Sequence, residues 1–235
     1  MNISRIGIFS IELFTPTAKF IAREGVLSNN KFYCLYKNIP TEDFEGLEII
    51  ENRPSIGQRL GSYIFRTLDI KWFYGSKKFG RAMLDRMSAD GVNTIICHFG
   101  PSGTEIFRCI DQRNLKIIVV FHGYDISKLL RYKSYRDALR RMGSDSRFHA
   151  RVVADYLVED LSNFFSRDRI HVIKNGVELK SDRSMPLNRQ SNLDYIYFQG
   201  ANLVEKKGQK YVIEAFSLLP RDIQLSSKVV FAGEG

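Results

Sequence analysis

The chain has 235 residues, of which 44% are hydrophobic and 26% are charged, and this ordinary globular composition excludes disordered, collagen-like and fibrous proteins. Its net charge is +9, of which +8 falls in residues 1–180, so we expect this part of the chain to meet an anionic partner. No apolar run is long enough to span a membrane, and residues 1–13 lack the pattern of a signal peptide. We therefore expect a cytoplasmic protein that can also lie peripherally on the inner face of the cell membrane.

Short runs rich in β-branched and aromatic residues alternate with helical patterns along the chain. Several runs, such as residues 117–121, are continuously apolar, which is typical of parallel strands buried on both faces. The alternation predicts a doubly wound α/β protein. The expected strands are 5–10, 32–36, 47–50, 94–98, 117–121, 147–154, 171–173, 194–198 and 228–232, and the expected helices are 17–28, 55–87, 104–113, 127–141, 155–165 and 209–218.

A polar stretch rich in serine and asparagine, residues 181–192, is typical of a linker. We therefore expect a first domain over residues 1–180 and the opening of a second domain over residues 193–235. This second part holds a single strand–helix–strand unit, which cannot by itself bury both faces of its sheet. The second domain is thus expected to be incomplete and only marginally stable.

The chain has three cysteines, Cys34, Cys97 and Cys109, each among apolar neighbours. The number is odd and no CxxC pair occurs, so we expect buried, reduced side chains rather than disulfides or a zinc site. No other set of metal ligands is visible in the sequence, and we expect no metal.

Two loops follow neighbouring expected strands at their carboxyl ends, where open α/β sheets bind ligands. The first loop contains His98 and Gly100, and the amides of the helix after it suit an anion; an ordinary strand-to-helix turn is the alternative. The second loop contains His122, Gly123 and Asp125. His122 could donate a hydrogen bond to a sugar hydroxyl or a phosphate, whereas Asp125 could simply cap the next helix.

A third loop, which contains Gly200 and Asn202, follows the expected strand 194–198. Lys206 and Lys207 come immediately before the next expected helix. Positive charge beside the amino end of a helix favours a diphosphate, and a solvated lysine turn is the alternative. The spacing matches neither the dinucleotide-binding glycine pattern nor the P-loop.

Two basic segments, 128–141 and 71–86, also contain apolar and aromatic side chains. The first has the pattern of a basic amphipathic helix. Both suit an anionic membrane surface, and a solvated helix face is the alternative. No nucleic-acid motif accompanies the charge, so we do not expect nucleic acid as a partner.

Four segments in chain order resemble retaining glycosyltransferases of family four, most closely their bacterial exopolysaccharide and lipopolysaccharide branch: HFGPSG (98–103), FHGYDIS (121–127), HVIKNGVEL (171–179) and GANLVEKKGQKYVIEAF (200–216). The resemblance implies a GT-B architecture of two Rossmann-like domains, with an acceptor domain followed by a sugar-nucleotide domain and the site in the cleft between them. It implies transfer of a sugar from a nucleotide-sugar donor to a lipid-linked or saccharide acceptor in surface polysaccharide biosynthesis, without a cofactor.

The resemblance also implies roles for individual residues. Lys207 matches the position that contacts the donor diphosphate, with Gly200 and Asn202 in the same donor loop, although the family commonly has an arginine near Asn202. His122 matches the catalytic histidine that reaches the transferred sugar. The residues placed at the acceptor side of the cleft are His98, Gly100, Gly123 and Asp125.

In this family the second domain continues well past the position of Gly235 and supplies a pair of glutamates that binds the nucleotide ribose and the sugar. We therefore expect the chain to be a fragment of a glycosyltransferase that is inactive as it stands. The alternative is a truncated product of the same ancestry that acts at most as an acceptor- or membrane-binding domain.

Overall fold

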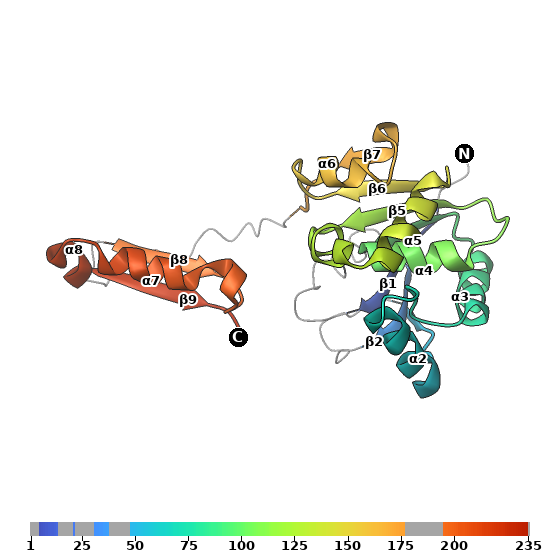
Figure 1. The fold of residues 1–235 in the computed structure, drawn as a ribbon, viewed down its shortest axis with the longest axis horizontal. Coiled ribbons are helices and arrows are strands. Elements are labelled where there is room, and N and C mark those ends of the chain that lie inside the picture. The colour runs from blue at the N-terminus through green and yellow to red at the C-terminus, as the bar shows by residue number, and fades with distance from the viewer. Residues whose placement is uncertain (1–4, 14–20, 22–30, 38–47, 177–194, 235) are drawn as a thin grey trace. The chain divides into compact units, whose positions relative to one another are not determined.

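The computed structural model describes residues 5–13, 21, 31–37, 48–176 and 195–234. The chain divides into two compact units, Met1–Gly176 and Val177–Gly235, and each is described by itself (Figure 1). The predicted linker, residues 181–192, lies outside the described residues. The predicted domain boundaries therefore stay predictions.

The larger unit is built on a seven-stranded sheet in the order β3-β2-β1-β4-β5-β6-β7, and every neighbouring pair in it is parallel. The chain moves outward from β1 in one direction and then from β4 in the other, which confirms the doubly wound α/β prediction. The strands are β1 (Ile6–Leu13), β2 (Lys31–Lys37), β3 (Ile49–Glu51), β4 (Thr94–His98), β5 (Lys116–Phe121), β6 (Phe148–Val152) and β7 (Ile170–Val172).

The described helices of this unit are α2 (Ile56–Thr67), α3 (Lys77–Ala89), α4 (Gly100–Cys109), α5 (Lys133–Ser144) and α6 (Leu157–Ser162), with 3-10 turns η3 (Tyr124–Ile126), η4 (Lys128–Arg131) and η5 (Arg167–Arg169). Helices α3, α4 and α5 lie together on one face of the sheet (Figure 1). The predicted helix 17–28 lies outside the described residues except for Ile21.

The prediction of one long helix over residues 55–87 is wrong, because the chain leaves the helix after Thr67 and starts a new one at Lys77. Asp69 has a positive φ of 53° at this break. Its carboxylate accepts hydrogen bonds from the backbone N–H groups of Lys133 (2.7 Å) and Ser134 (2.8 Å), so it caps the amino end of α5. The continued apolar pattern after Thr67 concealed this break.

Helix α4 begins four residues before the predicted start at Thr104. Pro101 occupies its first turn, a position where the missing N–H of proline costs no hydrogen bond. The glycine and proline that suggested a loop are therefore part of the helix.

The core lies between the sheet and the layer of α3, α4 and α5. The side chains of Phe9, Cys97 and Val119 are aligned across β1, β4 and β5 and are buried on this face. The apolar side of the basic segment 128–141 packs here too, through residues such as Tyr135 and Leu139. This segment offers its basic face to solvent and its apolar face to the core, and binding of that basic face to an anionic membrane surface stays a prediction.

In the second basic segment, 71–86, the side chain of Trp72 points inward and is buried in the same core. All three cysteines are buried, as expected. Among the described residues, no helix is both long and apolar enough to cross a membrane.

The smaller unit contains one parallel strand pair, β8 (Tyr195–Gly200) and β9 (Ser227–Ala232). Between the strands lie α7 (Gln209–Ser217) and α8 (Arg221–Leu225), the second of which was not predicted. Successive residues of β8 point to opposite faces of the sheet, and Tyr197 and Phe198 are 42% and 68% exposed. Both faces of this pair thus present apolar surface to solvent.

Candidate active site

The carboxyl ends of β1, β4 and β5 lie side by side because these strands are parallel neighbours in the sheet. His98 ends β4 and His122 follows β5, and the structure brings the two rings together. Nδ1 of His98 lies 3.3 Å from Nε2 of His122, and the rings are stacked with their centroids 5.5 Å apart. Two loops that are distant in sequence therefore share one histidine pair.

Asp125 joins these two loops through its buried carboxylate. Oδ2 accepts a hydrogen bond from the N–H of Gly100 (2.8 Å), and Oδ1 accepts from the N–H groups of His122 and Gly123 (both 3.0 Å). Asp125 thus contacts the loop before it and the start of α4, rather than the helix that follows it. Its carboxylate therefore accepts a hydrogen bond from the first N–H group of α4, a group that the sequence suggested could bind a ligand anion.

The two predicted site glycines of these loops, Gly100 and Gly123, have structural reasons to be glycine. A Cβ on Gly100 would lie 2.0 Å from Oη of Tyr135 and 2.8 Å from the ring of Phe121, so no side chain fits there. Gly123 has a φ of +102°, a conformation that other residues rarely adopt. Both positions let the loops approach each other closely enough for Asp125 to bridge them.

Phe99 is a strained residue that the sequence analysis did not identify. Its φ of 69° and ψ of 142° lie in a region that is populated almost only by glycine. Its N–H donates to the carbonyl of Val120 (2.9 Å), and its ring centroid lies 4.6 Å from that of His122. Strain of this kind costs about 1–3 kcal/mol and tends to occur at functional sites.

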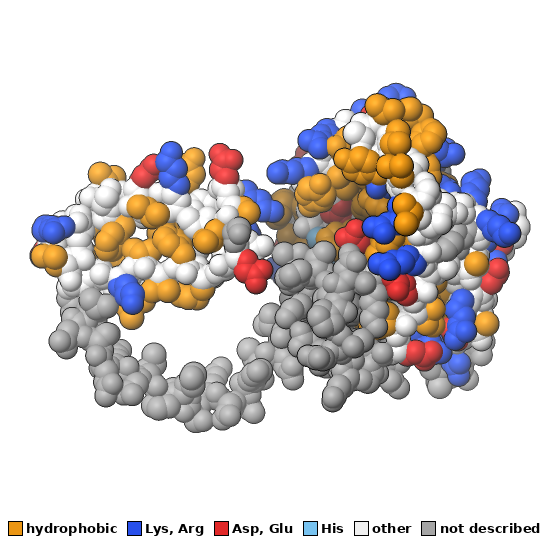
Figure 2. All heavy atoms as spheres, turned by 90° about the horizontal axis from the view of Figure 1, so that it is seen from below, with side chains coloured by type: hydrophobic (Ala, Val, Ile, Leu, Met, Phe, Trp, Pro, Cys, Tyr) orange, Lys and Arg blue, Asp and Glu red, His pale blue; other side chains and the backbone are white. Residues whose placement is uncertain are grey.

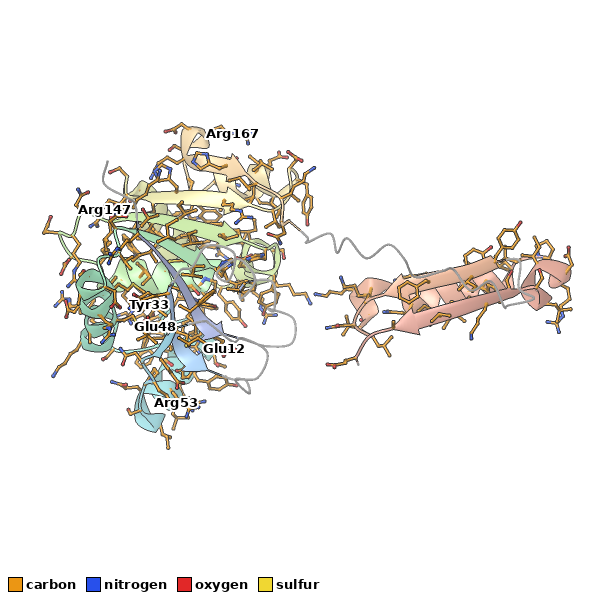
Figure 3. The ribbon with its side chains drawn as sticks, turned by 180° about the vertical axis from the view of Figure 1, so that it is seen from behind. Glu12, Tyr33, Glu48, Arg53, Arg147 and Arg167 are labelled. Atoms are coloured by element: carbon orange, nitrogen blue, oxygen red, sulfur yellow. The ribbon has the colours of Figure 1, made fainter. Side chains whose placement is uncertain are left out.

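A cavity of about 440 Å³ opens at this edge of the sheet. Its walls are largely aromatic, and its polar groups include a carboxylate at the end of β1, labelled in Figure 3, and a guanidinium from α2. The lining side chains are Ser10, Ile11, Glu12, Tyr63, Arg66, Thr67, Trp72, Tyr74, Phe99, Pro101, Ser102, Tyr124, Asp125, Leu129 and Tyr132. Of the predicted site residues only Asp125 lines the cavity, and Phe99 connects the cavity with the histidine pair.

Burial sets the charge state of these groups. It lowers the pKa of His122 to about 4, with a further lowering by the nearby guanidinium of Arg151, and it lowers the pKa of His98 well below its usual range. Burial raises the pKa of Asp125 to about 6, against the opposing effect of its backbone N–H partners. Both imidazoles are therefore neutral at pH 7 and act as hydrogen-bonding groups rather than as cations.

Arg151 is a second residue that the sequence analysis missed, since nothing in its local pattern marks it. It stands near the carboxyl end of β6, aligned with Val120 of β5. Its Nε donates to the carbonyl of Ile173 (3.2 Å), and an Nη donates to Oδ1 of Asn175 (3.4 Å). It thus holds the segment that follows β7 and also contributes to the neutral state of His122.

The predicted donor residues lie together in the smaller unit. Gly200 ends β8, and the carbonyl of Asn202 accepts a hydrogen bond from Nε2 of Gln209 at the start of α7 (2.9 Å). The carbonyl of Lys207 accepts from Nε2 of Gln199 (2.7 Å), and the lysine side chain is exposed one residue before the cap of α7. The loop therefore presents a fixed positive charge beside the amino end of a helix.

These donor residues and the histidine pair belong to different units. In the part of the chain that the structure describes, no group of three or more histidine, cysteine, aspartate or glutamate side chains could hold a metal ion.

No family model matches the sequence, and no curated protein matches it significantly. Solved structures do match. The apo form of WaaB, a lipopolysaccharide outer core galactosyltransferase, superposes with a TM-score of 0.60 at 12% identity over 98% of this chain and 68% of that one. HepE of Anabaena in complex with UDP superposes with a TM-score of 0.58 at 12% identity, over 97% of this chain and 69% of that one.

A glycosyltransferase from Rickettsia africae gives a TM-score of 0.55, again at 12% identity, with 97% and 68% covered. This chain has the fold of GT-B glycosyltransferases. At such low identity the likeness shows the fold alone, so membership of family four and retention at the sugar carbon stay predictions. The α/β, GT-B-like expectation is confirmed.

Proposed function

We propose that the chain carries out part of a glycosyltransferase reaction, in which a sugar moves from a nucleotide-sugar donor to a lipid-linked or saccharide acceptor in surface polysaccharide biosynthesis. The observation that supports this most is the aromatic cavity at the carboxyl edge of the larger sheet, beside a neutral histidine pair. The GT-B fold agrees with it, because ligands of open α/β sheets bind at this edge.

The cavity suits a saccharide acceptor. Aromatic side chains such as Tyr74 and Tyr124 offer flat apolar faces to a sugar ring, and their hydroxyl groups can bond to its hydroxyls. Glu12 and Arg66 lie in the same lining and supply a charged acceptor and a charged donor of hydrogen bonds. A few polar groups within a mainly apolar wall are typical of small-molecule sites.

His122 is proposed to donate a hydrogen bond to the transferred sugar, and His98 to position it. A neutral imidazole has one N–H donor and one acceptor nitrogen. Pairing of Nε2 of His122 with Nδ1 of His98 restricts the tautomer and orientation of the catalytic ring. Asp125 and Gly123 hold the loop on which His122 stands, and Gly100 is fixed by the same carboxylate.

The donor would bind at Gly200, Asn202 and Lys207 in the smaller unit. Cleavage of the sugar–phosphate bond, proposed to proceed with retention and without a cofactor, builds negative charge on the departing diphosphate. The Lys207 ammonium and the amino end of α7 would stabilise that charge. Asn202 can bond to a phosphate oxygen but adds no charge.

Calorimetric titration of the chain with UDP-, GDP- and TDP-sugars tests this proposal. We expect saturable binding of one nucleotide class, weakened roughly 10- to 100-fold in Lys207→Ala because a charge-assisted hydrogen bond is lost. Lys206→Ala, in the same turn, is the matched control and is expected to bind nearly as the wild type does. Absence of binding to every nucleotide sugar, or equal losses in the two variants, would overturn the proposal.

A further inference from the structure

A second cavity, of about 480 Å³, lies apart from the candidate active site. Its lining comes mainly from α4, from α5 and from the connection between α2 and α3, and none of the predicted site residues is among its described lining residues. Of these lining residues, Trp72 alone also lines the 440 Å³ cavity. The volume is in the range of small-molecule sites, so the cavity can receive a ligand of its own.

The lining of this second cavity is strongly basic. Basic side chains are spread over the face of the larger unit that Figure 2 shows, so positive charge by itself does not distinguish a site. Here the charges surround a hollow, and a single carboxylate accompanies them among the described lining residues. The basic side chains are Lys71, Lys77, Arg108, Arg141 and Arg147, and the carboxylate is that of Asp137.

Two of the guanidinium groups are already held by carboxylates. Arg108 pairs with Glu105, which is 3% exposed, and donates to the carbonyl of Gly75 (2.5 Å). Arg147, labelled in Figure 3, pairs with Asp145 (2.6 Å). These pairs fix part of the cavity wall and leave little charge uncompensated at the two arginines.

The other cations of the lining are not compensated in this way. The carboxylate of Asp137 is shared by Lys133 (3.2 Å) and Arg140 (3.0 Å). Nε of Arg141 donates only to the backbone carbonyl of Asp137 (3.3 Å), which carries no full charge. Because like charges repel, an anion with more than one negative charge is favoured beside the uncompensated cations. Among the described residues, the lining cations without a carboxylate partner are Lys71, Lys77 and Arg141.

One part of the cavity wall is apolar. It contains Trp72 and Phe107, together with Ile70, Ile110 and Ala138. Trp72 is 7% exposed, and its Nε1 has no hydrogen-bond partner among the described residues. A buried N–H without an acceptor is costly, and an oxygen atom of a bound ligand would remove that cost. The cavity thus offers flat apolar surface and an unused donor beside its uncompensated cations.

We propose that this cavity binds a small organic phosphate, with the phosphoryl group between Lys71, Lys77 and Arg141 and the apolar body against Trp72 and Phe107. A phosphate monoester carries close to two negative charges at pH 7 and has several acceptor oxygens. A carboxylate would bring only one charge, and inorganic phosphate would leave the apolar wall uncovered. The proposal goes beyond the proposed function and does not depend on it.

Fluorescence titration of the full chain with phenyl phosphate tests this site. Trp72 is the one tryptophan of the chain, so the emission reports on the wall of this cavity. The titration is carried out in the Lys207→Ala background, so that the donor loop takes no part in it. We expect a saturable change with a Kd about ten-fold lower than that of inorganic phosphate, because the phenyl ring buries apolar surface. Phenol, which lacks the phosphoryl group, is expected not to saturate.

Two pairs of substitutions locate the binding. Lys71→Gln/Arg141→Gln is expected to weaken phenyl phosphate binding about ten-fold or more, because charge-assisted hydrogen bonds are lost. Lys128→Gln/Arg131→Gln removes the same charge from residues that are not among the lining of either cavity, and is expected to bind within about two-fold of its parent. All four side chains are exposed, so the fold should persist, which circular dichroism checks.

Equal losses in the two double variants would mean that only the overall charge matters and would overturn the proposal. So would a loss confined to Arg66→Gln, because Arg66 lines only the 440 Å³ cavity and the ligand would then lie there. Binding of anionic lipid vesicles without binding of phenyl phosphate would contradict a site for a small soluble ligand. Absence of saturation in both fluorescence and calorimetry would also overturn it, whatever the outcome of the nucleotide-sugar titrations.

Discussion

At the scale of single residues, Asp125 and His122 are in contact but their pKa values are shifted so that protonation affects stability in opposite directions. The pKa of His122 falls from 6.5 to about 4, so its contribution to stability is full above pH 6.5 and is lost as the pH falls toward 4. The pKa of Asp125 rises from 3.8 to about 6, so its contribution is full below pH 3.8 and is lost as the pH rises through 6.

These opposite dependences give a prediction for two variants. Relative to His122→Gln, wild type is expected to lose up to about 3 kcal/mol of unfolding free energy between pH 6.5 and 4. Relative to Asp125→Asn, wild type is expected to lose unfolding free energy as the pH rises from 4 to 7. Urea unfolding at several pH values measures both differences, and parallel curves for all three proteins would contradict the assignment.

The strained backbone of Phe99 gives a second prediction. Phe99→Ala and Phe99→Gly both remove the ring, but only glycine relieves the positive φ. Phe99→Gly is therefore expected to be more stable than Phe99→Ala by about 1–2 kcal/mol in thermal unfolding. At Tyr124, a control in the adjacent loop, glycine is expected to be the less stable of the two. If Phe99→Ala were as stable as Phe99→Gly or more stable, the argument for strain would be wrong.

Residue types predicted part of this site in advance. His98 ends one strand, His122 and Asp125 follow the next, and all three lie within two residues of a glycine, a pattern that can be recognised in a sequence. Phe99 and Arg151 could not be identified from the sequence. The importance of Phe99 comes from its backbone conformation, and that of Arg151 comes from alignment between strands that are distant in sequence.

At the scale of elements, two glycines in helices are expected to behave oppositely. A Cβ on Gly61 of α2 would meet nothing within 4 Å, whereas one on Gly100 of α4 would collide with Tyr135. Gly61→Ala is expected to raise the unfolding free energy by about 0.5–1 kcal/mol. Gly100→Ala is expected to lower it by about 1–3 kcal/mol through overpacking. Thermal unfolding of both measures this, and the same sign of change in the two variants would contradict it.

Strands were predicted from sequence better than helices. Parallel strands buried on both faces are continuous apolar runs, and β4 was placed at its observed limits, Thr94–His98. The break between α2 and α3 was missed because it depends on the capping of α5 by Asp69. The exposure of apolar side chains on α2, such as Ile56 and Leu60, was missed because periodicity reveals an apolar face but not the direction in which it points.

At the scale of the whole molecule, the two units are expected to differ in stability. Strand β5 is covered by core side chains, whereas β8 exposes Tyr197 and Phe198 on its two faces. Amide hydrogen exchange is therefore expected to be much slower for residues 117–121 than for residues 195–200. Equal protection of the two strands would mean that the smaller unit is stabilised by more than its described contacts.

The proposed division of labour assigns the nucleotide to the smaller unit and the acceptor to the cavity of the larger one. Amide NMR spectra of the chain titrated in turn with UDP, GDP and TDP test this division most directly. We predict saturable shifts at residues 200–208, around Lys207, while the amides of residues 98–103 and 122–127 keep their positions. Saturable shifts centred on these two segments and absent from 200–208, or no saturable shift anywhere, would contradict it.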